Sequence, residues 1–184
     1  MIQFQSINKM LEKSFRNNWG REALSNYQGT TLKYSNVAKR IASLHIMFEQ
    51  CGLKKGDKVA ICSRNQANWG VCFLAAMTYG AVPVPLLHEF KPGNIHFLVN
   101  HSEAKVFFVE DTIWETLSEV EMPGVVAFVQ INTFKILYTQ DKHLQDLRDK
   151  FNELYNEIYP KGFQKEDISY YEDKEDELAL INYT

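Results

Sequence analysis

The segment from residue 59 to residue 86 constrains the fold more than any other part of the chain. Residues 59–62 (VAIC) are apolar without alternation, which is typical of a strand covered by helices on both faces. A helical pattern follows over about 66–79, and residues 81–86 have the pattern of a second strand. A strand, a helix and a strand of these lengths form a βαβ unit, which crosses over right-handed. The segment therefore predicts an α/β domain with parallel strands.

The second strand of this unit contains two prolines, Pro83 and Pro85. Proline has no backbone N–H, and residues two apart in a strand direct this group to the same side. Both missing donors therefore fall on one side of the strand. We expect this strand to pair fully on its other side only.

The rest of the chain alternates helical and strand patterns, with no internal repeat and no low-complexity linker. Two N-caps are expected, Ser6 for the first helix and Ser35 for a long second helix, and Thr112 with Glu115 has the spacing of a capping box. The expected apolar face of the first helix is Ile7, Met10, Leu11, Phe15 and Trp19. The other expected elements are a small hairpin at about 23–33, a helix from Pro92, strands at 105–109 and 124–130, a long helix at 141–158, and a buried strand at 178–181. The fold class is α/β, with a parallel or mixed sheet flanked by helices.

Composition excludes several classes of protein. The chain has 184 residues, 45% of them hydrophobic, and a formal net charge of -3 without a Lys/Arg cluster, which argues against a nucleic-acid partner. Residues 69–87 carry no charge, but Pro83 and Pro85 interrupt them, so a buried helix and strand are favoured over a membrane span. No secretory signal is present at the N-terminus, and the three cysteines have no zinc-like spacing. These features predict a cytoplasmic protein without a transmembrane segment.

The usual catalytic motifs do not occur. The chain has no glycine-rich phosphate loop and no nucleophile elbow, and His88-Glu89 lacks the second histidine of a zinc site. His96 and His101, five residues apart, are expected on different helix faces in solvent. Trp69 and Phe73 fit either a pocket wall or the core, and the core is favoured. Residues 166–177, with seven acids against one lysine, are expected to form a solvated loop. No catalytic residue and no metal ligand is therefore assigned.

A string of motifs over about residues 23–110 resembles the N-terminal region of the adenylate-forming, AMP-binding superfamily. The motifs are Thr31-Leu32-x-Tyr34, Gly52-Leu53-x-x-Gly56-Asp57-x-Val59-Ala60-Ile61, Asn65 with Trp69, Gly80-Ala81-Val82 and Val84-Pro85-Leu86. The resemblance resumes at the segment DELALINYT and is closest to long-chain acyl-CoA synthetases. It implies that residues 1–184 are an N-terminal subdomain fragment of the large domain, cut just before the phosphate-binding loop.

The resemblance also implies the candidate site. Tyr183 and Thr184 look like the first two residues of the ATP phosphate loop, where Thr184 would offer its hydroxyl to phosphate or metal. In such loops backbone N–H groups and hydroxyls hold the phosphates while Mg²⁺ offsets their charge. The whole enzyme would use ATP, Mg²⁺ and CoA to convert a carboxylic acid, here a fatty acid, into its CoA ester.

Two alternatives stay open. One is adenylation without CoA, as in a peptide synthetase or an acyl-carrier ligase, and the other is a non-catalytic α/β binding module. The fragment alone is expected to be inactive and to bind none of these ligands tightly. The acid, the acceptor thiol and the oligomeric state are left undetermined.

Overall fold

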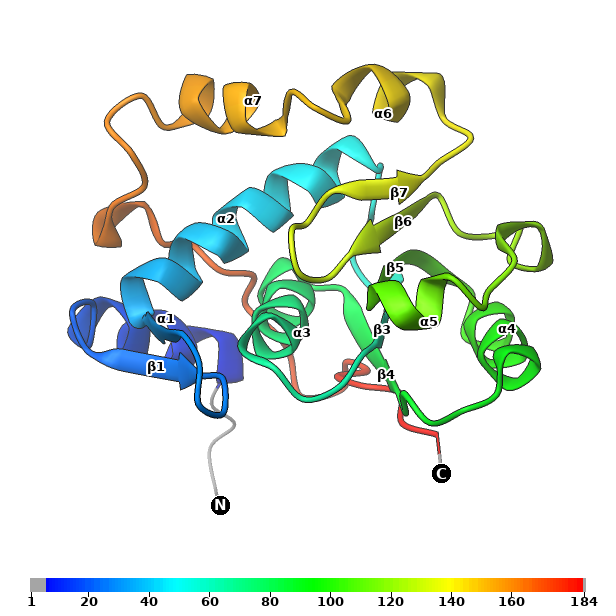
Figure 1. Ribbon diagram of the computed structural model, residues 1–184. Coiled ribbons are helices and arrows are strands. Elements are labelled where there is room, and N and C mark those ends of the chain that lie inside the picture. Colours follow the sequence, from blue (N-terminus) through cyan, green and yellow to red (C-terminus); the bar gives the residue numbers. More distant parts are fainter. Residues whose placement is uncertain (1–5, 184) are drawn as a thin grey trace.

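A mixed sheet of five strands forms the centre of the molecule, as the computed structural model of the chain shows for residues 6–183 (Figure 1). The strand order is β4–β3–β5–β6–β7. The strands are β3 (Lys58–Cys62), β4 (Val82–Leu86), β5 (Ala104–Val109), β6 (Ala127–Gln130) and β7 (Ile136–Tyr138). The first four are parallel, whereas β7 runs antiparallel to β6. The predicted α/β class with a parallel or mixed sheet is confirmed.

The connections place a topological switch point between β3 and β5. From β3 the chain passes through α3 (Ala67–Tyr79) to β4 on one side, and then through α4 (Pro92–His101) to β5 on the other side. The predicted βαβ unit is thus present, as β3–α3–β4. Crevices beyond the carboxyl ends of the strands at such a point are the usual ligand sites of open α/β sheets.

Helices cover both faces of the sheet, as the unbroken apolar pattern of the central strands predicts. Val59 and Ile61 face the cluster that contains α2 (Tyr34–Gln50) and α3, whereas Ala60 and Cys62 face the cluster that contains α4. All four of these strand residues are fully buried. The two faces are called here the α2 face and the α4 face.

The N-terminal region packs on the α2 face. Helix α1 (Ile7–Asn17) has Ser6 as its N-cap, and the Ser6 hydroxyl accepts a 3.1 Å hydrogen bond from the backbone N–H of Lys9, as predicted. The strands β1 (Glu22–Ser25) and β2 (Thr31–Lys33) pair antiparallel over the residues of the expected hairpin.

The predicted apolar face of α1 is partly wrong. Ile7 and Met10 are 48% and 52% exposed, while Asn8 is buried and donates its side-chain N–H to the carbonyl of Met77 at 2.9 Å. Phe15 is buried, as predicted. The helix is turned so that a hydrogen-bonding side chain, not an apolar one, meets the end of α3.

Two predicted helix caps are also wrong. Helix α2 begins at Tyr34 after the N-cap Lys33, because the side chain of Asn36 accepts a 3.0 Å hydrogen bond from the Lys33 N–H, so Ser35 lies inside the helix. Helix α5 (Asp111–Trp114) is a single turn after the N-cap Glu110, so Thr112 does not cap it.

The long helix predicted at 141–158 is two helices, α6 (Lys142–Leu147) and α7 (Phe151–Ile158). Helix α6 is held beside β7, where the Gln145 amide donates to the Thr139 carbonyl at 2.9 Å, whereas α7 packs on α2. One straight helix cannot follow both neighbours, so tertiary contacts override the sequence periodicity. Two short 3₁₀ turns complete the described elements, η1 (Glu119–Glu121) and η2 (Lys165–Asp167).

The uncharged stretch 69–87 is divided between α3 and β4. Among residues 6–183, no helix has both the length and the apolar character that crossing a bilayer requires.

Candidate functional site

The segment 178–183, which leads to the predicted phosphate loop, lies along the outer edge of β4. The backbone N–H of Ile181 donates to the carbonyl oxygen of Pro83 at 3.2 Å. Two residues earlier, Ala179 lines a small pocket together with Ala81, just before β4. The two segments therefore run in the same direction.

This segment is not the buried strand that was predicted at 178–181. The N–H and C=O of one strand residue point the same way, so Pro83 and Pro85 present carbonyls without N–H groups at this edge. A neighbouring strand would find no donors there for its own carbonyls, and a regular ladder does not form. Leu178 and Leu180 remain 58% and 42% exposed. Within residues 6–183, β4 pairs in the sheet with β3 alone, as the prolines predict.

Tyr183, one of the two predicted site residues, is held against α4. Its hydroxyl lies 2.8 Å from Nδ1 of His101, and the two rings meet edge to face with centroids 5.7 Å apart. Burial raises the pKa of the Tyr183 phenol. His101 is exposed, as expected, but it has this specific partner. Thr184, the other predicted site residue, lies outside the described residues.

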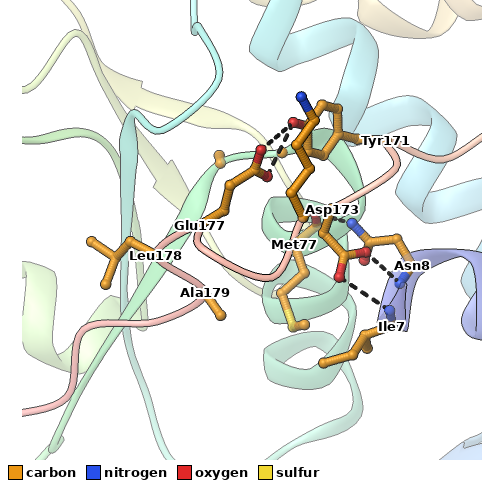
Figure 2. Close-up of a pocket in the computed structure, with 11 residues that line it drawn as sticks. Ile7, Asn8, Met77, Tyr171, Asp173, Glu177, Leu178 and Ala179 are labelled. Carbon is orange, nitrogen blue, oxygen red and sulfur yellow. Dashed lines mark hydrogen bonds between the residues drawn. The ribbon is translucent and has the colours of Figure 1, made fainter. Parts of the chain in front are cut away.

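The acidic stretch before this segment is anchored to the start of α1 (Figure 2). The carboxylate of Asp173 accepts hydrogen bonds from the Ser6 hydroxyl at 2.6 Å, the Asn8 N–H at 2.9 Å and the Ile7 N–H at 3.1 Å. Burial opposes the ionisation of Asp173, but these hydrogen bonds outweigh it and lower the pKa of the carboxyl. The predicted solvated loop at 166–177 is therefore partly fixed.

A second anchor forms at Glu177. Its carboxylate accepts hydrogen bonds from the Tyr171 hydroxyl at 2.9 and 3.0 Å and pairs with the ammonium group of Lys55. The Lys55 nitrogen also lies 4.9 Å from the centroid of the Tyr171 ring. The ion pair lies at the surface, so its net contribution to stability is small. It nevertheless fixes where the segment turns toward β4.

Gly80 allows Tyr171 to pack at this turn. Gly80 ends α3 with a φ of +88°, and a Cβ atom built on it would lie 2.9 Å from the Tyr171 ring. Both the backbone conformation and the close contact therefore require glycine.

A second candidate site is the crevice at the switch point, beyond the carboxyl ends of β3 and β5. Glu110 accepts a 3.0 Å hydrogen bond from the backbone N–H of Arg64, and its carboxylate lies 3.9 Å from the Arg64 guanidinium. These two residues line a pocket of about 310 Å³ with His88, Thr112 and Thr116. The pocket offers a cation, a carboxylate, an imidazole and hydroxyls, so it can bind a polar ligand.

Sequence reasoning missed Arg64 and Glu110 as a pair. Arg64 is the second residue after the buried strand 58–62, and Glu110 is the first residue after the buried strand 104–109. Because parallel strands bring their carboxyl ends to one edge, this position is the signal that could have identified them. The structure does not bring Tyr183 into this crevice, whose described lining contains no residue of the C-terminal segment.

Other candidate groups are explained by packing. Burial raises the pKa of the Cys51 and Cys62 thiols to about 12, which disfavours the thiolate that acts as a nucleophile. The rings of Trp69 and Phe73 stack 5.3 Å apart against the core of the α2 face. Within the described part of the chain, no group of three or more His, Cys, Asp or Glu side chains could hold a metal ion.

The sheet order and the helices on both faces define an open α/β domain with a crevice at its switch point. The chain belongs to the AMP-binding enzyme family, whose family model matches residues 11–184. The predicted resemblance to adenylate-forming enzymes is thereby confirmed.

Curated relatives include acyl-CoA ligases. The chain is 31% identical over 122 residues to "Fatty acyl-CoA synthetase A" of Dictyostelium discoideum, covering 66% of this chain and 17% of that protein. It is 30% identical over 125 residues to "Putative acyl--CoA ligase YdaB" of Bacillus subtilis, covering 63% of this chain and 25% of that protein. The chain thus matches a quarter or less of the length of these relatives.

Solved structures share the fold. The anthranilate CoA ligase AuaEII superposes over 100% of this chain and 32% of its own, with a TM-score of 0.75 at 16% identity. The nonribosomal peptide synthetase FmoA3 superposes over 70% of this chain and 13% of its own, with a TM-score of 0.61 at 15% identity. At these identities the likeness shows the fold, which both enzymes share with this chain.

Proposed function

We propose that this chain is the N-terminal part of an ATP-dependent acid–CoA ligase that acts on a fatty acid. The observation that carries the proposal is the 31% identity over 122 residues to Fatty acyl-CoA synthetase A. Because the chain covers only 17% of that relative, the activity is proposed for a longer protein that contains residues 1–184. Its location in the cytoplasm stays a prediction.

The proposed reaction has two steps. A carboxylate oxygen of the acid attacks the α-phosphorus of ATP, and the bond to the bridging oxygen of pyrophosphate breaks, which gives an acyl-adenylate. The sulfur of CoA then attacks the acyl carbon, its proton is lost, and AMP leaves. The first step brings two anions together, so positioning and charge neutralisation are its main requirements.

Tyr183 and Thr184 are proposed to open the loop that holds the ATP phosphates. In support, Tyr183 is fixed by His101, and Ile181 is fixed by Pro83, so the chain enters the proposed loop from a defined position. The hydroxyl of Thr184 and backbone N–H groups have the donor chemistry that phosphate requires. Mg²⁺ would offset the negative charge of the phosphates held in this loop.

Adenylation without CoA is the second candidate function. The fold likeness to FmoA3 supports it, since that protein is a nonribosomal peptide synthetase. The two candidates share the first step and differ only in the thiol that accepts the acyl group.

The first experiment measures fatty-acid-dependent exchange of pyrophosphate into ATP by the product of the natural reading frame that contains this chain. We expect exchange, followed by ester formation when CoA is added. Exchange with ester formation only on a carrier protein would favour the second candidate. Absence of exchange with every carboxylic acid would refute both candidates and favour a non-catalytic binding module.

Variants of the same product test the site. Thr184→Ala removes a proposed phosphate ligand and is expected to raise the KM for ATP about tenfold, the usual order for a hydrogen bond to a charged group. Thr30→Ala, at an exposed hairpin turn, is the matched control and should leave the KM unchanged. An unchanged KM for Thr184→Ala would remove this residue from the site.

The 184-residue chain alone is proposed to be inactive and to bind ATP weakly at most. The support is that the relatives extend well beyond the matched region. A micromolar dissociation constant for ATP, measured by calorimetry on this chain, would contradict the proposal.

A further inference from the structure

A pocket on the α2 face, opposite to Tyr183, combines two cations with hydroxyl and amide groups. It lies between α2, the β6–β7 connection and α7, and has a volume of about 430 Å³. Helix α2 contributes Lys39, Arg40 and Ser43, the connection contributes Thr133, and α7 contributes Asn152. No carboxylate lines this pocket in the described part of the chain. The pocket is called here the basic pocket.

Arg40 is held in position by a buried amide. Its guanidinium donates through one nitrogen to the side-chain oxygen of Asn68, which is only 9% exposed. The amide nitrogen of Asn68 in turn donates to the carbonyls of Ile131 and Asn132, at 2.9 and 3.1 Å. One buried side chain thus fixes both Arg40 and the backbone of the β6–β7 connection, which both line the basic pocket.

The positive charges of the basic pocket are uncompensated. Over residues 6–183, neither Lys39 nor Arg40 lies within 4.0 Å of a carboxylate oxygen. Arg40 is partly buried, and desolvation lowers the pKa of its guanidinium. A guanidinium has five N–H donors, and the side-chain oxygen of Asn68 accepts a hydrogen bond from one of those of Arg40. A partly buried cation without a counter-ion is costly unless a partner satisfies it.

The β6–β7 connection also shows a strained backbone at the basic pocket. Phe134 has a φ of +59°, a left-handed conformation that is uncommon for a residue with a side chain. Its ring packs edge to face on Phe108, with centroids 6.4 Å apart, which stabilises this conformation. Phe134 and Tyr155 both line the pocket and give it apolar walls beside the two cations.

We propose that the basic pocket binds a phosphomonoester, with Lys39 and Arg40 neutralising the phosphate and Ser43, Thr133 and Asn152 donating hydrogen bonds. Arginine forks and hydroxyl donors match the oxygens of a phosphate dianion. The volume exceeds that of a phosphate ion, and the aromatic walls suit the organic part of an ester. This site is separate from the proposed ATP loop, because Tyr183 packs on the α4 face.

The test is a titration of the 184-residue chain, labelled with ¹⁵N, at constant ionic strength and followed by NMR. Inorganic phosphate and phenyl phosphate are the two probes. We expect saturable shifts of the Ser43 and Thr133 amides with both probes, and tighter binding of phenyl phosphate because of the aromatic walls. Equal affinity for both probes would overturn the assignment to an ester.

Two variants distinguish the pocket from general electrostatic attraction. Lys39→Gln removes an exposed cation and should weaken binding about tenfold, while Asn152→Asp places a carboxylate in the pocket and should abolish the shifts. Lys13→Gln, an exposed cation on α1, is the matched control and should bind as the parent chain does. No saturable shift at Ser43 and Thr133, or equal weakening by Lys13→Gln, would refute the site. Neither result depends on pyrophosphate exchange, so the two proposals can fail separately.

Discussion

The backbone N–H of Ile181 and the carbonyl oxygen of Pro83 form a 3.2 Å hydrogen bond across an edge of the sheet that has acceptors but lacks two donors. At Pro83 and Pro85 the edge offers carbonyls only. The segment that leads to the proposed phosphate loop is therefore bound to β4 without being part of the sheet. Such an attachment is easier to open than a regular strand, because few backbone hydrogen bonds must break.

Replacing Pro85 with valine should tighten this attachment. The new N–H points to the outer edge, where a parallel register places it within reach of the Ile181 carbonyl. One added hydrogen bond should slow hydrogen exchange at the amides of Ile181 and Tyr183 about threefold to tenfold. Pro160→Ala, in an exposed turn after α7, is the control. Unchanged exchange in Pro85→Val would show that the prolines do not limit the pairing.

Asp173→Asn should destabilise the fold by about 1 kcal/mol at neutral pH, the usual value for losing a helix cap. The native pKa of Asp173 is lowered from 3.8, so its ionisation stabilises the fold above pH 3.8 and this contribution is lost as the pH falls through the native pKa. Urea unfolding of both proteins should therefore differ at pH 7 and converge in acid. Asp176→Asn, at an exposed position of the same stretch, should change little. A constant difference across this pH range would argue against an ionised cap.

His45 should make stability depend on pH. Burial lowers its pKa from 6.5 to about 4, although the hydrogen bond to the Ala75 carbonyl opposes the shift. Between pH 6.5 and about 4 the His45 imidazole is therefore protonated in the unfolded state but neutral in the native state. The free energy of unfolding consequently decreases as the pH drops from 6.5 toward 4. This group contributes a slope of at most about 1.4 kcal/mol per pH unit. The slope should disappear in His45→Gln and persist in His88→Gln, a change at an exposed turn. The same slope in His45→Gln would assign the dependence to other groups.

Gly80→Ala should destabilise the fold by about 1–3 kcal/mol, because it combines a strained φ with a contact at the Tyr171 ring. Thermal unfolding measures the loss. In the double variant with Tyr171→Ala the contact is removed, so the added cost of Gly80→Ala should decrease to that of the backbone alone. Gly93→Ala in α4, where an added Cβ atom would meet no other atom within 4 Å, should be tolerated. An equal loss in both Tyr171 backgrounds would show that the ring does not matter.

Local sequence patterns predicted the centre of the fold because burial there is nearly complete. The unbroken apolar run at Val59–Cys62 is typical of a strand covered on both faces, and the prolines of β4 indicate an edge directly. The same reasoning failed where long-range contacts decide. The strand β7 has three residues and depends on β6, and the helix predicted at 141–158 divides between two neighbours.

The candidate site was predictable to a smaller extent. Tyr183 stays a predicted site residue that rests on the resemblance, and its partner His101 is 82 positions away and carries no local signal. Arg64 and Glu110 are 46 positions apart and meet only because the sheet places β5 beside β3. The basic pocket likewise draws on three separate elements. Sites of this kind can be predicted only after the order of the strands in the sheet is known.

The cap of α1 has a consequence for the order of folding. Asp173 leaves the ribosome 167 positions after Ser6. During synthesis the backbone N–H groups of Ile7 and Asn8 therefore stay in water until the segment that contains Asp173 has emerged. Helix α1 is thus expected to settle later than the elements that follow it in the sequence, although it is made before them.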